Sequence, residues 1–223
     1  MSKVDLSFIF AVLTKGVMTT VIVALGACVV AIVLGLVVGL TRVSPHRQLR
    51  WFSIAYIEFF RGTSMLVQLY WWFFVLPIFG IVLSPWTVGI LGIGMNASGY
   101  AAEYVRAAIQ AVDRGQYEAS TALNFSRLAM MRRIILPQAM RAMLPTWGNM
   151  LIDVLKGSSL VFFITITEFT SAAKQAADAT GDYMLFFAVA LFGYYIIARA
   201  LITPFVRWLE RRVSRGFVRE QLA

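Results

Sequence analysis

The sequence predicts an all-α integral membrane protein with about five transmembrane helices, and two observations support this prediction. The 223 residues are 60% hydrophobic and 14% charged, with a mean hydropathy of +0.76, which is outside the range of soluble globular domains. Five segments are long enough to cross about 30 Å of hydrocarbon at about 1.5 Å per residue. They are residues 16–40, 51–76, 87–112, 142–166 and 183–205.

Basic residues are divided unevenly between the two sides that alternating loops would define. A net charge of +9 is also typical of nucleic-acid binders, but a soluble binder would not carry several segments of spanning length. One side holds Arg42, Arg47, Arg50, Arg114, Arg127, Arg132, Arg133, Arg141, Arg207, Arg211, Arg212, Arg215 and Arg219. The other side holds only Lys3, Lys15 and Lys174. By the positive-inside rule we expect the N-terminus outside and the C-terminus in the cytoplasm.

The N-terminal region predicts an anchor followed by a first span. Residues 1–10 mix polar and apolar side chains, which predicts a short interfacial helix outside the membrane. The apolar run that follows is not a signal peptide, because it continues past Cys28 to Leu40, and a signal core has only about 7–15 residues. Cys28 is the only cysteine, so the chain has no internal disulfide.

The second span is interrupted by polar residues. Arg61, Gly62, Thr63 and Ser64 divide residues 51–76, and such a break is tolerated only where it is buried in protein or lines a watery cavity. Glu58 lies three residues before Arg61, so on one helix face the two charges can neutralise each other.

The third and fourth spans carry small and charged residues. The third is rich in glycine and alanine, which predicts a central position in a bundle, and Glu103 and Arg106 are expected to form a structural ion pair. The fourth follows Pro145, which suits the first turn of a helix. It also contains Asp153 and Lys156, each of which costs about 2.5–3.5 kcal/mol near mid-membrane unless paired or hydrated.

The last part of the chain predicts an external segment and a final span. Residues 168–182 are polar, and we expect a short helix over residues 171–177. The fifth span carries one charge, Arg199, near enough to the inner surface for its long side chain to reach water.

A polar segment at residues 113–141 lies on the predicted cytoplasmic side. Its residues favour a short helix with Glu118 near the start, a left-handed turn at Asn124, and a second helix that stops before Pro137. This would be a compact knob. An amphipathic helix held at acidic headgroups by arginines explains the same residues equally well on physical grounds.

The spacing of this segment resembles the loop by which membrane subunits of ABC importers contact their ATPases. That loop reads E-A-A, three residues, G, nine residues, I-x-L-P. Serine replaces one alanine here, and asparagine, which also tolerates the left-handed conformation, replaces the glycine. The matching residues, which the resemblance assigns to ATPase coupling, are Glu118, Ala119, Ser120, Asn124, Ile134, Leu136 and Pro137.

The resemblance covers about half of the chain. The stretches EFFRGTSMLVQL, YAAEYVRAAIQAVDRGQYEAS, ILPQAMRAMLP and KGSSL look like those of permeases for polar amino acids. This implies that residues 1–223 form a single permease domain in a bacterial inner membrane. The implied partners are a second permease subunit, identical or paralogous, two cytoplasmic ATPases and an extracytoplasmic solute-binding protein, all acting in a lipid bilayer.

Departures from the family pattern leave the solute open. Ser64 replaces the family's proline, which should soften the break in the second span. Gly157 and Ser158 replace its aspartate and threonine, so an intramembrane anion is lost, and an amino acid, an opine or another zwitterionic or compatible solute is possible. The residues expected to line the path or to brace the helices around it are Glu58, Arg61, Gln68, Asp153, Lys156, Ser158 and Ser159. Lys156 is the residue expected to bind a carboxylate.

Other functions fit the sequence less well. The alternative is a stand-alone secondary carrier, but its fold usually has an inverted repeat, and breaks in the second and fourth of five spans do not form two halves. A membrane scaffold would not explain the inner charges. The chain lacks the G-x-x-x-x-G-K-[ST] loop, so we expect no cofactor and expect ATP on a partner subunit. We also expect no catalytic residue, no metal at the sole histidine, His46, and no nucleic-acid partner.

Overall fold

The computed structural model describes residues 6–218, and every regular element within that range is helical. The longer helices are α1 (Leu6–Arg42), α2 (Arg47–Gly62), α4 (Pro85–Gln110), α7 (Leu136–Gly157), α9 (Tyr183–Ile197) and α10 (Thr203–Val218). The shorter α-helices are α3 (Met65–Tyr70), α5 (Arg114–Ala122), α6 (Arg127–Met130) and α8 (Phe169–Thr180). Segments with π- or 3₁₀-helical geometry are η1 (Trp71–Val75), η2 (Leu76–Phe79), η3 (Met131–Ile135), η4 (Ser158–Ile164) and η5 (Ala198–Ile202).

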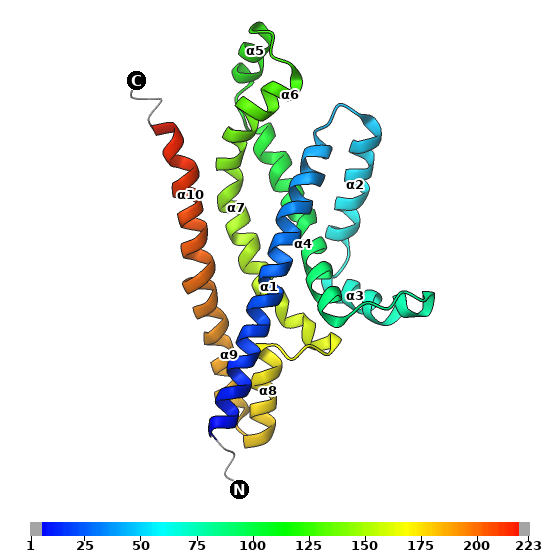
Figure 1. The fold of residues 1–223 in the computed structure, drawn as a ribbon, viewed down its shortest axis with the longest axis vertical. Coiled ribbons are helices and arrows are strands. Elements are labelled where there is room, and N and C mark those ends of the chain that lie inside the picture. Colours follow the sequence, from blue (N-terminus) through cyan, green and yellow to red (C-terminus); the bar gives the residue numbers. More distant parts are fainter. Residues whose placement is uncertain (1–5, 219–223) are drawn as a thin grey trace.

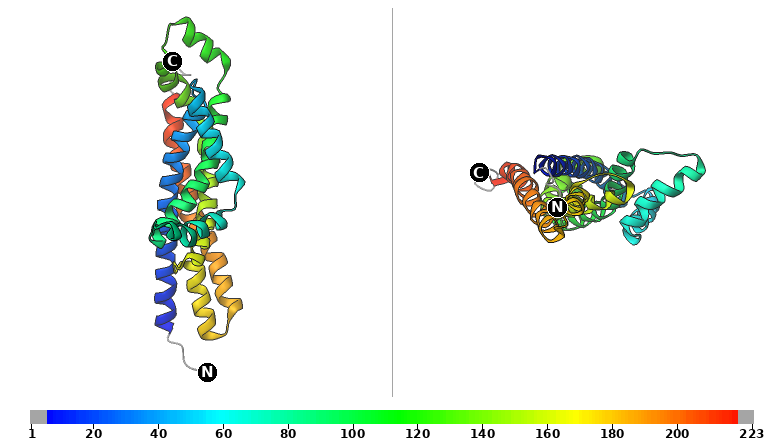
Figure 2. Two further views of the ribbon diagram at one scale, coloured as in Figure 1. Left: turned by 90° about the vertical axis from the view of Figure 1, so that its right-hand side faces the viewer. Right: turned by 90° about the horizontal axis from the view of Figure 1, so that it is seen from below.

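Helix α4 is the centre of the bundle, as its small residues predicted. It packs against α1, α7, α2 and α3, and the main core follows its buried face. The chain is elongated (Figure 1), and a view from below places α9 and α10 at one edge and the arm formed by α3, η1 and η2 at the other (Figure 2).

Small residues let α1 and α4 approach closely. A Cβ atom added at Gly94 would lie 2.6 Å from Cβ of Val30, and one added at Gly35 would collide with Ala101. Neither position can hold a larger side chain unless the two helices separate. The apolar stripe that these glycines complete includes Val23, Ala27 and Ala31 of α1, all fully buried.

Three helical runs are long and apolar enough to cross a membrane within the described residues: Ile9–Arg42, Arg127–Ile164 and Tyr183–Leu209. A fourth is reached if the bent pair Arg47–Gly62 and Met65–Phe79 counts as one span. The remaining expected span, the third at residues 87–112, falls on α4, which is long enough but is not among these runs. Because α1, α7 and α2 cover α4, it needs little apolar surface of its own.

Local expectations near the spans were partly wrong. Leu6–Phe10 begin α1 rather than a separate interfacial helix, and residues 1–5 lie outside the described part of the chain. Pro145 is in the interior of α7, because the helix begins nine residues earlier, at Leu136, with Pro137 in its first turn. The external helix expected at residues 171–177 is present as α8.

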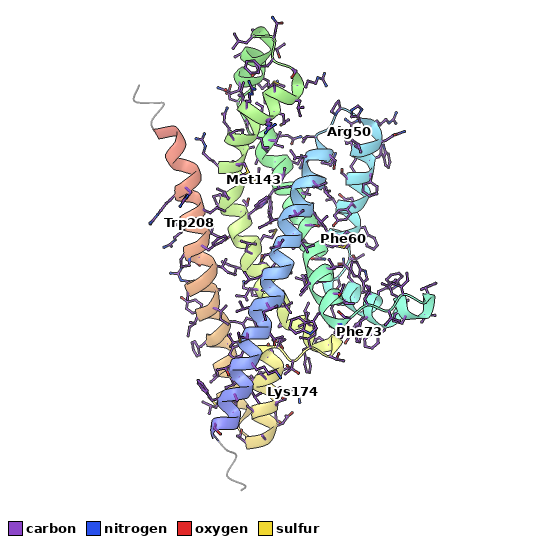
Figure 3. All side chains as sticks on the ribbon, viewed as in Figure 1. Arg50, Phe60, Phe73, Met143, Lys174 and Trp208 are labelled. Atoms are coloured by element: carbon purple, nitrogen blue, oxygen red, sulfur yellow. The ribbon has the colours of Figure 1, made fainter. Side chains whose placement is uncertain are left out.

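The two ends of the molecule differ in charge. The α1–α2 turn, α5, α6 and the C-terminal part of α10 lie together at the upper end (Figure 1). We call this the basic end, since most arginines assigned to one side by the sequence belong to these elements. Lys174 of α8 lies near the opposite end (Figure 3). Arg219 and Lys3 fall outside the described residues.

Candidate functional site

Helices α5 and α6 form a knob that projects from the basic end (Figure 1). Asp113 caps α5 by accepting a hydrogen bond from N–H of Gly115 (2.7 Å), and Ser126 caps α6 through N–H of Ala129 (3.3 Å). Between the two helices, Asn124 has a φ of 55°, as its residue type predicted. The N–H of Phe125 then donates to the carbonyl of Ser120 (3.0 Å), which closes the end of α5.

The second helix of the knob does not stop at Pro137, contrary to the expectation from the sequence. Helices α6, η3 and α7 form one continuous run, Arg127–Ile164. The π-helical turn η3 ends immediately before α7, and Pro137 occupies the first turn of α7. A π-helical turn changes the hydrogen-bond register, which lets the helix pass a proline that a regular helix interior would not accept.

The residues that resemble a coupling loop fall into two groups. Glu118, Ala119 and Asn124 are exposed at the tip of the knob. Ser120 is buried and donates its hydroxyl to the carbonyl of Gln116. The remaining three are partly buried at the root, where the knob joins the bundle, and are Ile134, Leu136 and Pro137. Their role in coupling stays a prediction.

Two apolar residues at the tip were not singled out from the sequence. Leu123 and Leu128 are 71% and 78% exposed, which is unusual for leucine on a segment that projects into water. They flank the turn at Asn124. Large apolar side chains exposed on a projecting segment are a common feature of surfaces that bind another protein.

The root of the knob is tied to two helices of the bundle. The hydroxyl of Tyr117 donates to the carbonyl of Ile109 in α4 (2.9 Å), and the amide of Gln138 in α7 donates to the side chain of Gln116 in α5 (3.2 Å). Desolvation raises the pKa of the Tyr117 hydroxyl, which therefore stays protonated as a donor. A displacement of the knob would thus reach both α4 and α7.

The second span contains a sharp bend at its polar break. The axes of Arg47–Gly62 and Met65–Phe79 differ by 101°, although the sequence led us to expect a milder break with serine at position 64. Thr63 and Ser64 take extended backbone conformations between the two helices. The chain therefore leaves α2 and continues sideways into the arm of α3, η1 and η2 (Figure 1).

A buried amide network holds this bend. The side-chain N–H₂ of Asn96 in α4 donates to the carbonyl of Phe60 (2.8 Å) and to the side-chain oxygen of Gln68 (3.3 Å). Gln68 in turn donates to the carbonyls of Phe60 (3.2 Å) and Thr63 (3.4 Å). These bonds satisfy carbonyls that the end of α2 leaves free. Gln68 was predicted from the sequence, but Asn96 was not, because its partners are far away along the chain.

The expected pair between Glu58 and Arg61 is not formed. Both side chains are exposed, and no ion pair joins them among the described residues. The guanidinium of Arg61 instead lies 5.2 Å from the centroid of the Tyr100 ring on α4. The expected pair between Glu103 and Arg106 is present, with an N–O distance of 2.7 Å.

Helix α7 presents a polar face along its length. Asp153 and Lys156 form an ion pair at 3.4 Å, and their side chains are 74% and 67% exposed. Thr146 and Asn149 are exposed on the same side of the helix, because successive spacings of three, four and three residues join Thr146, Asn149, Asp153 and Lys156. Polar side chains exposed on a spanning helix cannot face lipid tails without a large cost. The polar face of α7 must therefore meet water or another protein.

Ser158 and Ser159 close the end of α7. Their hydroxyls donate to the carbonyls of Leu155 (2.7 Å) and Lys156 (2.8 Å). Segment η4, which begins at Ser158, packs against α3, so the breaks after α2 and after α7 meet in the fold. Lys156 and Ser159 also line a cavity of about 270 Å³ together with Thr170 and Tyr194.

A buried carboxylate lies at the end of the molecule opposite the knob. Glu168 is fully buried and caps α8 by accepting from N–H of Thr170 (2.7 Å) and Ser171 (2.8 Å), while the Tyr194 hydroxyl donates to it (2.7 Å). Burial raises the pKa of the Glu168 carboxyl, although these hydrogen bonds oppose part of the rise. The carboxylate links α8 to α9.

We expect Glu168→Gln to change how stability depends on pH. Because the pKa is higher in the folded protein, this carboxyl favours folding below its ordinary pKa of about 4.3, and the contribution is lost as the pH rises through the raised value. The melting temperature of Glu168→Gln relative to wild type should therefore increase from about pH 4 to about pH 8. The exposed Glu118→Gln is the control, and an unchanging difference for Glu168→Gln would contradict the expectation.

Comparisons with known proteins agree with this arrangement. Residues 31–215 match the family described as binding-protein-dependent transport system inner membrane component. The "Probable amino-acid ABC transporter permease protein y4tF" of Sinorhizobium fredii (strain NBRC 101917 / NGR234) is 44% identical over 183 residues, covering 79% of this chain and 76% of that protein. The "Probable amino-acid ABC transporter permease protein YckA" of Bacillus subtilis (strain 168) is 36% identical over 205 residues, covering 92% and 90%. The crystal structure of an amino acid ABC transporter with histidines has a TM-score of 0.84 at 31% identity, covering 95% of this chain and 100% of that chain.

Proposed function

Since the chain belongs to the binding-protein-dependent transport system inner membrane components, and is thus the permease of an ABC importer, we propose that it carries an amino acid or a related zwitterionic solute. The permease is a transport component and not itself a catalyst. The stand-alone carrier is excluded by the same membership. The observation that carries the choice of solute is the exposed pair of Asp153 and Lys156. A zwitterionic amino acid has an ammonium group that would bind the aspartate and a carboxylate that would bind the lysine.

The knob is proposed to bind a cytoplasmic ATPase, which holds the ATP. In this proposal Glu118, Leu123 and Leu128 contact the ATPase, and two such ATPases serve a pair of permeases. The exposure of these three side chains supports the assignment. The link from Tyr117 to α4 and the continuous helix from α6 into α7 then carry movement of the knob into the bundle.

The basic end is proposed to face the cytoplasm, with the start of α1 outside. The arginines gathered at that end support this orientation, because positively charged loops are retained on the inner side of bacterial membranes. The opposite end, with α8, then faces the solute-binding protein.

A second permease is proposed to cover the polar face of α7. Thr146, Asn149, Asp153 and Lys156 are exposed in the single chain, and lipid is a poor solvent for them. A second copy or a paralogue placed there would enclose a watery path between two such faces. The exposed Glu58 and Arg61 at the bend would border the same path.

The inner polar residues are proposed to divide into two roles. Gln68, Ser158 and Ser159 brace, since their side chains donate to backbone carbonyls at the ends of α2 and α7. The exposed Glu58, Arg61, Asp153 and Lys156 line the path, with Lys156 binding the solute carboxylate. Movement of α4 relative to α7 would change the distance between Arg61 and Lys156. Arg61 lies at the bend, which Asn96 of α4 holds, and Lys156 lies on α7 itself.

We expect Lys156→Met to reduce solute uptake at least tenfold, because loss of a charged hydrogen bond to a carboxylate costs about 1.5–3 kcal/mol. Uptake of radiolabelled amino acids into proteoliposomes that contain the whole importer measures this. Lys174→Met is the matched control, since Lys174 is also paired with an aspartate, four residues away at 2.6 Å, but lies on α8 and not on the polar face of α7.

Both variants should retain the ATPase during purification. If both variants take up solute at the wild-type rate, Lys156 does not line the path. If both variants lose uptake, the effect does not depend on solute binding by Lys156 and arises from general damage to the structure around α7 and α8.

A further inference from the structure

A cleft of about 380 Å³ lies at the basic end, between the α1–α2 turn and the root of the knob. Its lining comes from five helical elements and the α1–α2 turn, and includes Arg42, Ser44, Arg50, Arg106, Tyr117 and Met131. This volume is within the range of about 300–1,000 Å³ found for small-ligand pockets. The cleft is separate from the bend of the second span and from the polar face of α7.

The cleft has an excess of positive charge. Its three arginines are offset by one carboxylate, Glu103, which lies 2.7 Å from Arg106 and 3.9 Å from Nε of Arg42. The Arg42 Nε is shut off from solvent and makes no hydrogen bond within the described structure. Arg50 is exposed, and no ion pair or hydrogen bond of its side chain occurs among the described residues. The Arg50 guanidinium is therefore available to donate to an anion, and the other two arginines add positive charge beside it.

The cleft lies at the level where a membrane surface would meet the protein. The first apolar span ends at Arg42, and Trp51 and Phe52, directly after Arg50, are 62% and 71% exposed. Arginine beside exposed aromatic residues at the end of a span is typical of the interfacial region. Figure 3 places Arg50 at the top of α2, near the end of α1. An anion at this depth is most simply a lipid phosphate.

We propose that this cleft binds the phosphate-bearing headgroup of an anionic phospholipid from the cytoplasmic leaflet. The proposal rests on the cytoplasmic orientation of the basic end. A headgroup there would contact Arg42 and Arg50 on one side and the region of Ile109 and Tyr117 on the other. Since the Tyr117 hydroxyl donates to the Ile109 carbonyl at the root of the knob, the lipid would stiffen the connection between knob and bundle.

The test compares lipid retention by the purified permease–ATPase complex in native mass spectrometry. Complexes are taken from nanodiscs of phosphatidylcholine with and without phosphatidylglycerol. We expect Arg50→Gln to retain phosphatidylglycerol about five-fold less than wild type, the loss typical for one basic residue near an anionic surface. Arg50→Lys should restore most of the binding. Arg47→Gln is the matched control, because Arg47 is in the same helix but does not line the cleft.

Several outcomes would overturn the proposal. Equal losses in Arg50→Gln and Arg47→Gln would mean a diffuse attraction to charged lipid. Inorganic phosphate that stabilises wild type but not Arg50→Gln in pure phosphatidylcholine would identify free phosphate as the ligand. Dissociation of the ATPase from Arg50→Gln, with lipid retained, would make the cleft a protein contact. Lipid retention does not depend on transport, so failure here leaves the proposed function intact.

Discussion

Glu118→Arg is expected to abolish solute-stimulated ATP hydrolysis in the reconstituted importer. Glu118 is exposed on α5 at the tip of the knob and makes no ion pair within the described residues, so the substitution leaves the fold of the permease undisturbed. If Glu118 contacts a basic group of the ATPase, as proposed, the substitution places like charges opposite each other, which costs on the order of several kcal/mol. Stimulated hydrolysis should therefore fall by more than tenfold, measured as phosphate release in proteoliposomes with the solute-binding protein present.

Two further variants show whether the effect belongs to the knob. Glu118→Gln removes the charge without reversing it, so its activity should be intermediate. Asp178→Arg makes the same change in charge at the opposite end; it breaks an exposed ion pair with Lys174, which is worth little, and an exposed hydrogen bond from the Tyr183 hydroxyl. Wild-type hydrolysis by Glu118→Arg in an intact complex would rule out a coupling role for this residue.

Asn96→Leu is expected to have the second large effect. The substitution keeps the number and branching of the side-chain heavy atoms, but it removes the N–H₂ that donates to the Phe60 carbonyl and to Gln68 in the buried network at the bend. The Phe60 carbonyl keeps the bond from Gln68, but the buried side-chain oxygen of Gln68 loses its donor, and a buried polar group left without a partner costs about 1–3 kcal/mol. We therefore expect a lower melting temperature and a loss of uptake, because the bend positions Arg61 and Glu58.

Met95→Leu is the matched control for this experiment. Met95 is the neighbouring residue on α4, is partly buried and takes no part in the network, and exchange between methionine and leucine usually costs less than about 1.5 kcal/mol. The two variants are compared by thermal unfolding in detergent and by uptake in proteoliposomes. If they behave alike, the bend does not depend on the Asn96 amide.

Two of the predictions that rest on near neighbours in the sequence were confirmed, whereas the pair of Glu58 and Arg61 was not formed. Glu103 and Arg106 pair because three residues place them on one helix face, and Asn124 turns left-handed because its side chain tolerates that backbone. Pro137 is the informative exception. A local rule predicted a stop, but the π-helical turn before it and the burial of Ile135 in the core keep the helix continuous.

Interactions between distant residues could not be predicted. Asn96 and Phe60 are 36 residues apart, and Tyr194 and Glu168 are 26 apart, so no periodic pattern joins them. The contact of Arg61 could not be predicted either. Its spacing predicted an ion pair with Glu58, but its guanidinium lies over the ring of Tyr100 on another helix. Each of these contacts forms only because α4 or α9 packs beside a segment that is far away along the chain.

The sequence by itself determined that this protein is a helical membrane protein with its arginines on one side and a left-handed turn at Asn124, since hydropathy, loop charge and turn preference are local properties. The tertiary structure alone decided which polar residues brace and which stay exposed. Bracing requires a buried donor to meet a carbonyl across the bundle, as Asn96 and Gln68 do, whereas Asp153 and Lys156 remain on an open face. Whether a polar side chain is buried depends on which helix lies next to it, and hydropathy does not encode that.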